Sequence, residues 1–198
     1  MDIVIATENK GKIREIREAL DIPGVRLLSL EEFDEWPDLE ETGGTLEENA
    51  LIKAFALRDR LGLPALADDS GLLVDALDGR PGVRSSRYAG PEGDPERNMD
   101  KLLAELKEVR DGERNARFAC VMALALPSGE VRVTRGECEG AILTRRRGSG
   151  GFGYDPVFMP AGFDRSMAEL SLEEKNAISH RGKALREMKK ILETMREA

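Results

Sequence analysis

The chain has 198 residues, of which 40% are hydrophobic and 34% charged, and its formal net charge is −8. This length suits one globular domain with a core of its own, and we expect a single domain over residues 1–198. The negative charge argues against binding along a nucleic-acid polymer, which requires a basic face. The longest apolar run, residues 118–126, is far shorter than the roughly 20 residues of a membrane-spanning helix, so we expect no membrane association.

Cysteine and histidine are too scarce to build a disulfide framework or a histidine-rich metal site. Cys120 and Cys138 lie far apart in the sequence, and the N-terminus has no pattern of a secretory signal. We therefore expect reduced thiols in a cytoplasmic protein. Because His180 is the only histidine, a bound metal should be held mainly by oxygen atoms, which favours Mg²⁺ or Mn²⁺.

The chain begins with a pattern of a strand, a polar loop and a helix. Residues 3–6 are apolar and predict a buried strand, and Asn9 is placed to cap a following amphipathic helix. The N-terminus of a helix attracts anions, and Lys10 and Lys12 add positive charge there. The loop matches neither a Walker A motif nor a dinucleotide fingerprint, so two surface lysines on an amphipathic helix explain the same residues.

A second strand, over residues 25–30, is followed by a second helix with clear end signals. Thr45 and Glu48 form a capping box, and Gly62 is placed to end the helix. Glu41 lies just outside the start of this helix. Acids at such positions usually interact with the helix dipole, so metal binding by Glu41 is the less favoured alternative on position alone.

The most unusual stretch is Leu66-Ala67-Asp68-Asp69-Ser70-Gly71-Leu72, where two acids interrupt an apolar run. Adjacent carboxylates are costly to desolvate unless cations or donors compensate them. We expect a strand that ends here in a sharp turn at Gly71. Because neighbouring side chains of a strand point to opposite faces, we expect one of Asp68 and Asp69 to face a cleft while the other holds the turn. A solvated turn explains the stretch equally well when it is taken alone.

Further along, a helix and a pair of strands are predicted. Asp94 and Pro95 are suited to the first positions of a helix. Residues 117–126 are nearly all apolar and predict a central strand that is covered on both faces. Residues 127–129 then form a turn into a strand over 130–137, as in a hairpin. Strands that alternate with helices, followed by an antiparallel pair, predict an α/β fold with a mixed sheet.

A glycine-rich stretch, residues 148–153, follows three arginines at 145–147. Glycine allows the backbone to approach a ligand closely, and the rings of Phe152 and Tyr154 are suited to stacking on a nucleobase. The alternative is a flexible hairpin loop that two aromatic residues anchor. We interpret the three arginines as a solvated face.

The last part of the chain predicts two helices. Ser171 and Glu174 form a second capping box, and Lys175 follows on the same short helix. Residues 179–182 open the final helix. A lone histidine is more often structural than catalytic, but His180 lies beside Arg181 at a helix start, where anions bind.

Six motifs occur in a fixed order along the chain: Thr7-Glu8-Asn9-Lys10-Gly11-Lys12, Glu41-Thr42-Gly43, Asn49-Ala50 with Lys53, Asp68-Asp69-Ser70-Gly71-Leu72, Gly151-Phe152-Gly153-Tyr154-Asp155-Pro156, and Lys175 with Ser179-His180-Arg181-Gly182. Their order and spacing resemble the inosine triphosphate pyrophosphatase family, enzymes that remove aberrant purine nucleotides. The resemblance runs from the first predicted strand to the last predicted helix.

This resemblance implies an α/β fold of two lobes around a long central mixed β-sheet, with flanking helices and a nucleotide cleft between the lobes. It implies a homodimer that cleaves ITP, dITP and XTP between the α and β phosphates, which yields the monophosphate and pyrophosphate. It implies that Asp69 is the catalytic base and that Asp69 and Glu41 bind Mg²⁺, for which Mn²⁺ is a possible substitute. The substrate contacts that it implies are Thr7, Glu8, Asn9, Lys10, Gly11, Lys12, Lys53, Ser70, Phe152, Gly153, Tyr154, Asp155, Lys175, His180 and Arg181.

Hypoxanthine and xanthine carry a carbonyl at position six, where adenine carries an amino group. A donor directed at that position, from His180, Arg181 or a backbone N–H, would favour ITP over ATP. Three other functions stay open. A pyrophosphatase for modified pyrimidine or methylated nucleotides would differ only in its base pocket, a nucleotide-binding regulator would show no turnover, and a generic phosphatase would release inorganic phosphate first.

Overall fold

β1 (Asp2–Ile5) lies between two parallel neighbours, which confirms the predicted first strand. It pairs with β2 (Arg26–Leu28) on one side and with the beginning of β3 (Ala65–Val74) on the other, where Val4 lies opposite Ala65. Ile3, Val4 and Ile5 are at most 1% exposed. The predicted second strand is confirmed, although it is shorter than the apolar run suggested.

β5 (Asn115–Ala125) and β6 (Val131–Ile142) form the predicted central strand and hairpin. In the turn that joins them, the Leu126 N–H donates to the Glu130 carbonyl at 2.9 Å. Hydrogen-bonded neighbours follow the order β2-β1-β3-β5-β6-β7, with β4 paired to β3. The sheet contains parallel and antiparallel pairs, so the predicted α/β fold with a mixed sheet is confirmed.

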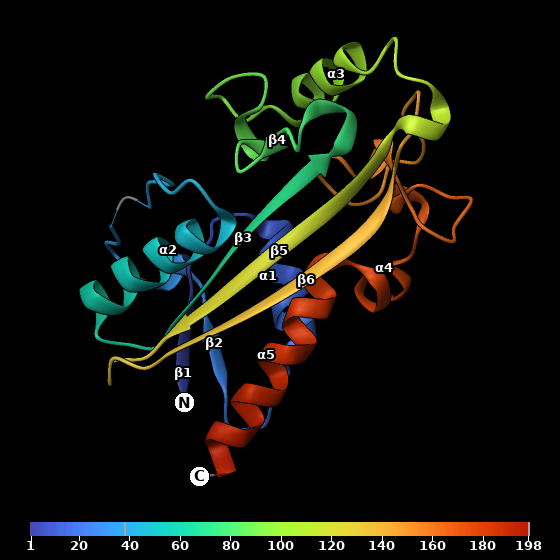
Figure 1. Cartoon of the computed structure of the whole chain (residues 1–198). Coiled ribbons are helices and arrows are strands. Elements are labelled where there is room, and N and C mark those ends of the chain that lie inside the picture. The colour runs from blue at the N-terminus through green and yellow to red at the C-terminus, as the bar shows by residue number, and fades with distance from the viewer. Residues whose placement is uncertain (38, 198) are drawn as a thin grey trace. The chain divides into compact units, whose positions relative to one another are not determined.

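The computed structural model describes residues 1–37 and 39–197. The predicted domain over 1–198 thus includes two positions, 38 and 198, that lie outside the described residues, and the single domain stays a prediction. The described chain divides into two compact units. The first unit comprises residues 1–69, 120–136 and 181 onward, and the second comprises residues 70–119 and 137–180. β3, β5 and β6 contribute residues to both (Figure 1).

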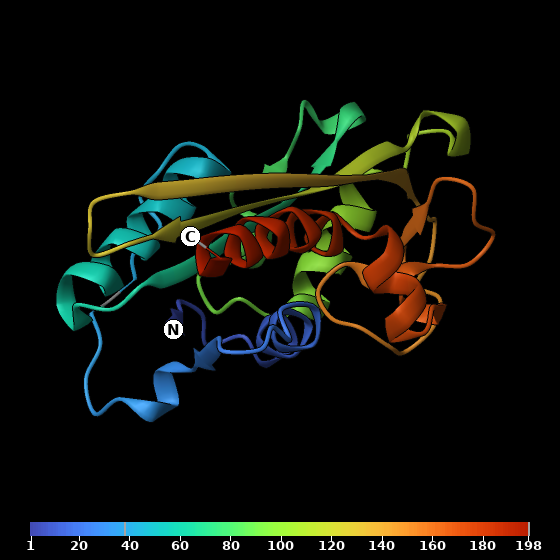
Figure 2. The same cartoon turned by 90° about the horizontal axis from the view of Figure 1, so that it is seen from below.

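The first unit contains α1 (Lys10–Ala19), α2 (Leu46–Leu61) and all of α5 (His180–Glu197) except its first residue. α1 and α5 lie side by side (Figures 1 and 2). They share a core with alternate residues of the strands: Ile3, Ile5, Ile16, Leu20, Ile22, Leu66, Cys120, Met122, Leu124, Leu126, Ala184, Leu185, Met188 and Leu192. The side chain of Asp68 contacts α1 and α5, whereas that of Asp69 contacts α2. Because strand neighbours point to opposite faces, α2 covers the other face of β3.

The helices begin and end at the predicted capping residues. The side chain of Asn9 accepts a hydrogen bond from the Lys12 N–H, and Thr45 and Glu48 form the expected capping box. Gly62 ends α2 with a φ of 67°, a left-handed conformation that glycine adopts at little cost. The predicted caps of the second unit, Asp94 and Ser171, are also observed.

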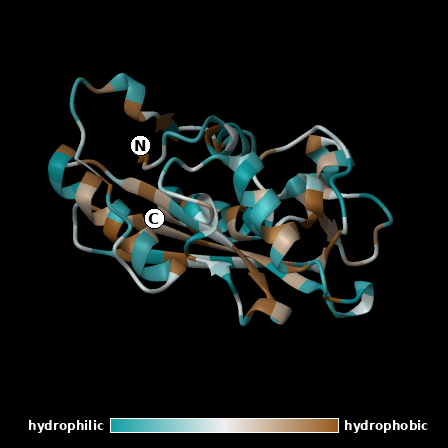
Figure 3. Cartoon of the chain, turned by 90° about the horizontal axis from the view of Figure 1, so that it is seen from above, coloured by the Kyte–Doolittle hydropathy of each residue, from teal (hydrophilic) through white to brown (hydrophobic). Residues whose placement is uncertain are grey.

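The second unit combines short strands with α3 (Pro95–Glu105) and α4 (Leu172–Ile178). The end of β3 pairs with β4 (Pro81–Gly82), and the end of β6 pairs with β7 (Phe158–Pro160), both in antiparallel fashion. Figure 3 shows hydrophobic residues concentrated along the strands. The core residues are Leu72, Val74, Leu77, Tyr88, Met99, Leu102, Leu106, Ala116, Phe118, Cys138, Ile142, Tyr154, Val157, Phe158 and Met167. Within the described chain, every helix is too short or too polar to cross a membrane.

One local prediction is wrong, because the chain does not turn at Gly71. β3 continues without interruption from Ala65 to Val74. Beyond the acids, the Leu72 N–H donates to the Ser85 Oγ at 2.9 Å, and Leu72 pairs with β4. A solvated turn is excluded as well, since Asp68 and Asp69 are 1% and 4% exposed. Lys12 and Arg181 compensate the buried Asp68, and Asn49 compensates the buried Asp69, so neither acid needs solvent.

Candidate active site

Asp68 and Asp69 face two different environments, as strand geometry predicts. The Asp68 Oδ2 lies 2.9 Å from the Lys12 Nζ and 3.3 Å from an Arg181 nitrogen. The Asp69 Oδ2 accepts a hydrogen bond from the Asn49 Nδ2 at 3.1 Å, and its Oδ1 lies 3.6 Å from the Lys53 Nζ. One strand thus carries two neighbouring carboxylates with separate sets of partners.

Asp68 belongs to a buried ionic network that holds α1, β3 and α5 together. Arg181 lies between Asp68 and Glu15, and its guanidinium is 2.5 Å from the Glu15 Oε2, where both side chains are 2% exposed. Burial alone would raise the pKa of Asp68, but the charges of Lys12 and Arg181 hold that pKa far below its ordinary range. The guanidinium of Arg181 therefore stabilises the first unit, and its contact with substrate stays a prediction.

Asp69 belongs to a second cluster, in which Lys53 is the central cation. The Lys53 Nζ lies 2.8 Å from the Glu41 Oε1 and donates to the Asp68 carbonyl at 2.7 Å. Burial raises the pKa of Asp69 to about 6, the positive charge of Lys53 opposes this increase, and the negative charge of Glu41 adds to it. A carboxylate with a pKa near 6 is ionised at neutral pH and accepts a proton more readily than an ordinary aspartate does.

The carboxylate oxygens beside Lys53 are suited to a divalent metal ion that a phosphate ligand also coordinates. Glu41 and Asp69 both face Lys53 and supply oxygen atoms, the donors that Mg²⁺ prefers. Among residues 1–37 and 39–197, no group of three or more His, Cys, Asp or Glu side chains is placed to hold a metal. Proteins commonly bind Mg²⁺ through one or two carboxylates while substrate phosphates and water complete the coordination. The pair is consistent with that arrangement.

The predicted phosphate loop, residues 7–12, joins the end of β1 to the start of α1. The Asn9 N–H donates to the Thr7 Oγ1 at 3.2 Å, and the Lys12 N–H donates to the Asn9 Oδ1 at 3.1 Å. Glu8 and Lys10 are exposed, and Gly11 lies in the first turn of the helix. This loop therefore presents the N-terminus of a ten-residue helix, an environment that favours phosphate.

Another polar cluster, formed by Asp155, Lys175 and Phe152, lies in the second unit around the glycine-rich stretch. The Asp155 Oδ2 accepts hydrogen bonds from the Lys175 Nζ at 2.8 Å and from the Phe152 N–H at 2.9 Å. The Lys175 Nζ lies 4.5 Å from the centre of the Phe152 ring. A Cβ at Gly151 would lie 2.0 Å from the Asp155 Oδ2, and Gly151 has a φ of 71°. Glycine is thus required where this carboxylate closes the loop.

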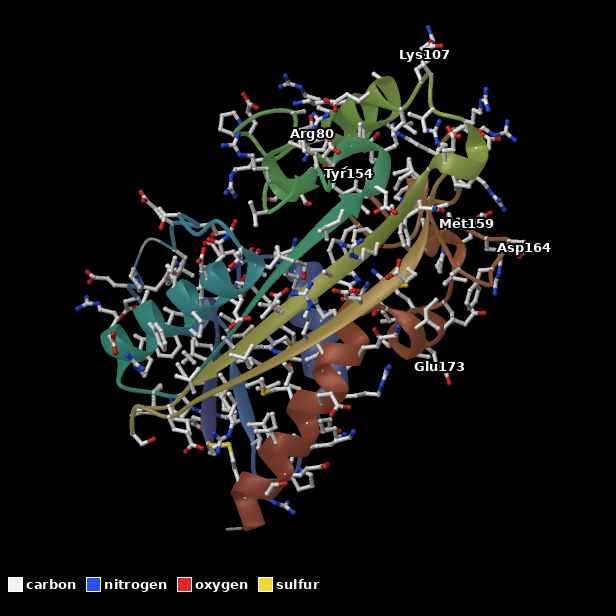
Figure 4. All side chains as sticks on the ribbon, in the orientation of Figure 1. Arg80, Lys107, Tyr154, Met159, Asp164 and Glu173 are labelled. Atoms are coloured by element: carbon white, nitrogen blue, oxygen red, sulfur yellow. The ribbon has the colours of Figure 1, made fainter. Side chains whose placement is uncertain are left out.

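The two aromatic residues of this stretch have different surroundings. Tyr154 is 5% exposed, lies beside the end of β3 (Figure 4), and donates its hydroxyl hydrogen to the Ser85 carbonyl at 2.8 Å. Phe152 is only partly buried. The ring of Phe152 is therefore the more accessible of the two, and contact with a nucleobase stays a prediction for both.

The remaining predicted residues occupy well-defined places. The His180 ring stacks on Phe118, with ring centres 4.7 Å apart and planes tilted by 14°. Ser70 follows Asp69 in β3, and Gly153 has a φ of 60°. Of the three arginines at 145–147, Arg146 pairs with Glu96 and Asp100, and Arg147 pairs with Glu169. These pairs agree with the interpretation of a charged surface.

Two residues that the sequence patterns gave no role, Asn49 and Glu15, also contact these groups. Asn49 belongs to the motif that contains Lys53 but was given no role; it lies one helical turn before Lys53, and this spacing places both side chains on one face of α2. Glu15 gave no signal, because it lies beside Ile16 on α1 and its partner Arg181 is 166 positions away. Thr7, Asn9, Lys12, Lys53 and Asp69 all belong to the first unit. Their roles, and the position of Lys175 relative to Asp69, stay predictions.

Comparisons with known proteins agree on one family. The model of the Ham1 family matches residues 3–191. The chain is 55% identical over 183 residues to a dITP/XTP pyrophosphatase of Geobacter sulfurreducens, covering 92% of each chain, and 50% identical over 190 residues to one of Halalkalibacterium halodurans, covering 96% of this chain and 98% of the relative. Among solved structures, a HAM1 protein of Coxiella burnetii is 43% identical with a TM-score of 0.90, and the match covers 98% of this chain and 99% of that protein. The Staphylococcus aureus Ham1 protein is 40% identical with a TM-score of 0.89, and the match covers 98% of this chain and 100% of that protein. The chain therefore belongs to the Ham1 family.

Proposed function

We propose that the chain hydrolyses non-standard purine nucleoside triphosphates, such as dITP, ITP and XTP, to the nucleoside monophosphate and pyrophosphate. Relatives called dITP/XTP pyrophosphatases match it at 50–55% identity over more than nine-tenths of its length. The observation that carries the proposal is the cluster of Asp69, Glu41 and Lys53, in which two carboxylates meet a buried cation. Such a cluster suits a polyanionic substrate that brings its own divalent ion.

The proposed reaction is the attack of water on the α-phosphorus. Asp69 accepts the proton of the attacking water, for which its raised pKa is suited. Lys53 and Lys12 offset the negative charge that develops on the leaving pyrophosphate. When bound by Glu41 and Asp69, Mg²⁺, or Mn²⁺ in its place, supplies further neutralisation of the phosphate chain.

The other predicted substrate contacts divide between the two units. We propose that residues 7–12 bind phosphate through the backbone N–H groups at the start of α1. Phe152 is proposed to stack on the purine, and Asp155 and Lys175 to contact its polar edge. His180, Arg181 or a backbone N–H is proposed to donate to the six-carbonyl of the base. A mismatched donor in a buried site discriminates by about 10⁴-fold, which would favour ITP over ATP.

We also propose a homodimer in the cytoplasm, on the resemblance to the pyrophosphatase family. The dimer is tested by the mass of the purified protein in solution.

A substrate panel tests the function directly. The purified protein is incubated with ITP, dITP, XTP, GTP and ATP plus Mg²⁺, and pyrophosphate and inorganic phosphate are measured separately. We expect pyrophosphate from the first three nucleotides and little from ATP. Equal rates on ITP and ATP would contradict the base preference. Binding of ITP without pyrophosphate would support the regulator, and inorganic phosphate as the first product would support the generic phosphatase.

A further inference from the structure

Asn49 contacts both the proposed catalytic carboxylate and the loop that carries Glu41. Its side chain on α2 is fully buried, at 0% exposure. The Nδ2 donates to the Asp69 Oδ2 at 3.1 Å, and the Oδ1 accepts from the Gly43 N–H at 2.7 Å. A single amide therefore joins α2 to β3 and to the segment just after Glu41.

The orientation of this amide is fixed by its partners. The Gly43 N–H can only donate, so the atom that faces it must be the carbonyl oxygen of Asn49. The NH₂ group must then face Asp69, whose ionised carboxylate only accepts. The loop after Glu41 lies so close to α2 that position 43 requires glycine. A Cβ at Gly43 would lie 2.7 Å from the Glu48 Cβ and 2.8 Å from the Asn49 Oδ1.

We propose that Asn49 is a positioning residue, which holds the Asp69 carboxylate in one orientation and keeps the Glu41 loop beside Lys53. Its catalytic consequence rests on the proposed function. Because Asn49 binds the Oδ2 of Asp69, the Oδ1 is the atom directed at the Lys53 Nζ, 3.6 Å away. Groups that orient a catalytic side chain through a hydrogen bond contribute about 10- to 100-fold to activity or metal affinity.

The first test replaces the donor and keeps the acceptor. Asn49→Asp preserves size and an oxygen for the Gly43 N–H, but it directs a second carboxylate at Asp69. We expect kcat for dITP to fall by about 10- to 100-fold while KM changes by less than about threefold. An increase in KM with unchanged kcat would overturn the proposal, because it would indicate substrate binding rather than positioning.

Asn98 on α3 provides a matched control. It is also buried, at 3% exposure, its Oδ1 accepts from the Ala89 N–H at 2.6 Å, and its Nδ2 donates to the Ser86 carbonyl at 2.9 Å. The control has the same two-sided geometry but no carboxylate partner. We expect Asn98→Asp to lower stability and leave kcat close to wild type. Equal losses of kcat in the two variants would overturn the proposal.

The second test needs no turnover and uses protein free of metal and nucleotide. Asn49→Asp should lower the urea midpoint at pH 7.5 when Asp69 is present, because two carboxylates then face each other. It should cost little in the Asp69→Asn background, where the exchanged amide donates to the new carboxylate. Equal costs in both backgrounds would overturn the contact. If this coupling is observed but the wild type releases no pyrophosphate from dITP, the contact is confirmed and the proposed function is refuted.

Discussion

Asp69→Asn should make the metal-free protein more stable at neutral pH. Burial raises the pKa of Asp69 from 3.8 to about 6; the positive charge of Lys53 opposes this increase, and the negative charge of Glu41 adds to it. At pH values between these two pKa values, the Asp69 carboxyl is ionised in the unfolded chain and protonated in the folded chain. Folding stability therefore falls as the pH rises through this window, and the full cost is present above pH 6.

The size of the cost follows from the shift in pKa. Roughly two pKa units at 1.36 kcal/mol each correspond to about 3 kcal/mol. The amide of Asp69→Asn resembles the protonated carboxyl and avoids this cost, but Lys53 then loses one negatively charged neighbour. We expect a net gain of about 1–3 kcal/mol in unfolding free energy at pH 7.5, and almost none at pH 4, where the folded carboxyl is already protonated.

Urea denaturation followed by circular dichroism at pH 4 and pH 7.5, in the presence of EDTA, measures this difference. The adjacent residue is the control, since the charges around Asp68 lower its pKa. Asp68 contributes stability that is present above its unfolded pKa and is lost only as the pH falls below that value. Asp68→Asn should therefore be destabilising at pH 7.5. A loss of stability in Asp69→Asn at pH 7.5, or an equal gain at both pH values, would refute the reasoning.

Four further predictions concern the ionic network of Arg181, the loop at Gly43, the ring of Phe152 and the divalent ion. Arg181→Met should lower the unfolding free energy by about 3–5 kcal/mol, because it leaves Glu15 and Asp68 buried without their shared guanidinium; a loss below about 1 kcal/mol in urea denaturation would contradict the network. Gly43→Ala should cost about 1–3 kcal/mol through overpacking, measured in the same way; an unchanged midpoint would contradict it. Phe152→Ala should raise the KM for dITP about tenfold or more if the ring stacks on the base, and an unchanged KM would argue against stacking. Removal of divalent ions with EDTA should stop turnover without unfolding the protein, and full activity in EDTA would exclude the proposed metal.

Helix boundaries were predictable because their chemistry is local. Asn9, Thr45 and Gly62 act on backbone groups within four positions, so the sequence alone contains both partners. The opposite orientation of Asp68 and Asp69 was predictable for the same reason, since it follows from strand geometry. The continuation of β3 was not, because β4 and Ser85 are contributed by a later part of the chain.

The partners that site residues find inside the fold were less predictable than their positions in the sequence motifs. The contact of Arg181 with an anion stays a prediction, but its ion pairs with Glu15 and Asp68 were not predictable, because these partners are more than 100 positions away. The stacking of Tyr154 on a base likewise stays a prediction, whereas its hydrogen bond to the Ser85 carbonyl, 69 positions away, was not predictable. In both cases a buried polar group found a partner through the fold, and this pairing could not be deduced from residue type and spacing.

The most direct test of the central claim, that the Asp69 carboxylate drives hydrolysis, compares pyrophosphate release from dITP by the wild type and by Asp69→Asn under saturating Mg²⁺. We predict that the variant remains folded and releases pyrophosphate about 10³-fold more slowly, the typical contribution of a positioned general base. Release within tenfold of the wild-type rate would contradict the assignment.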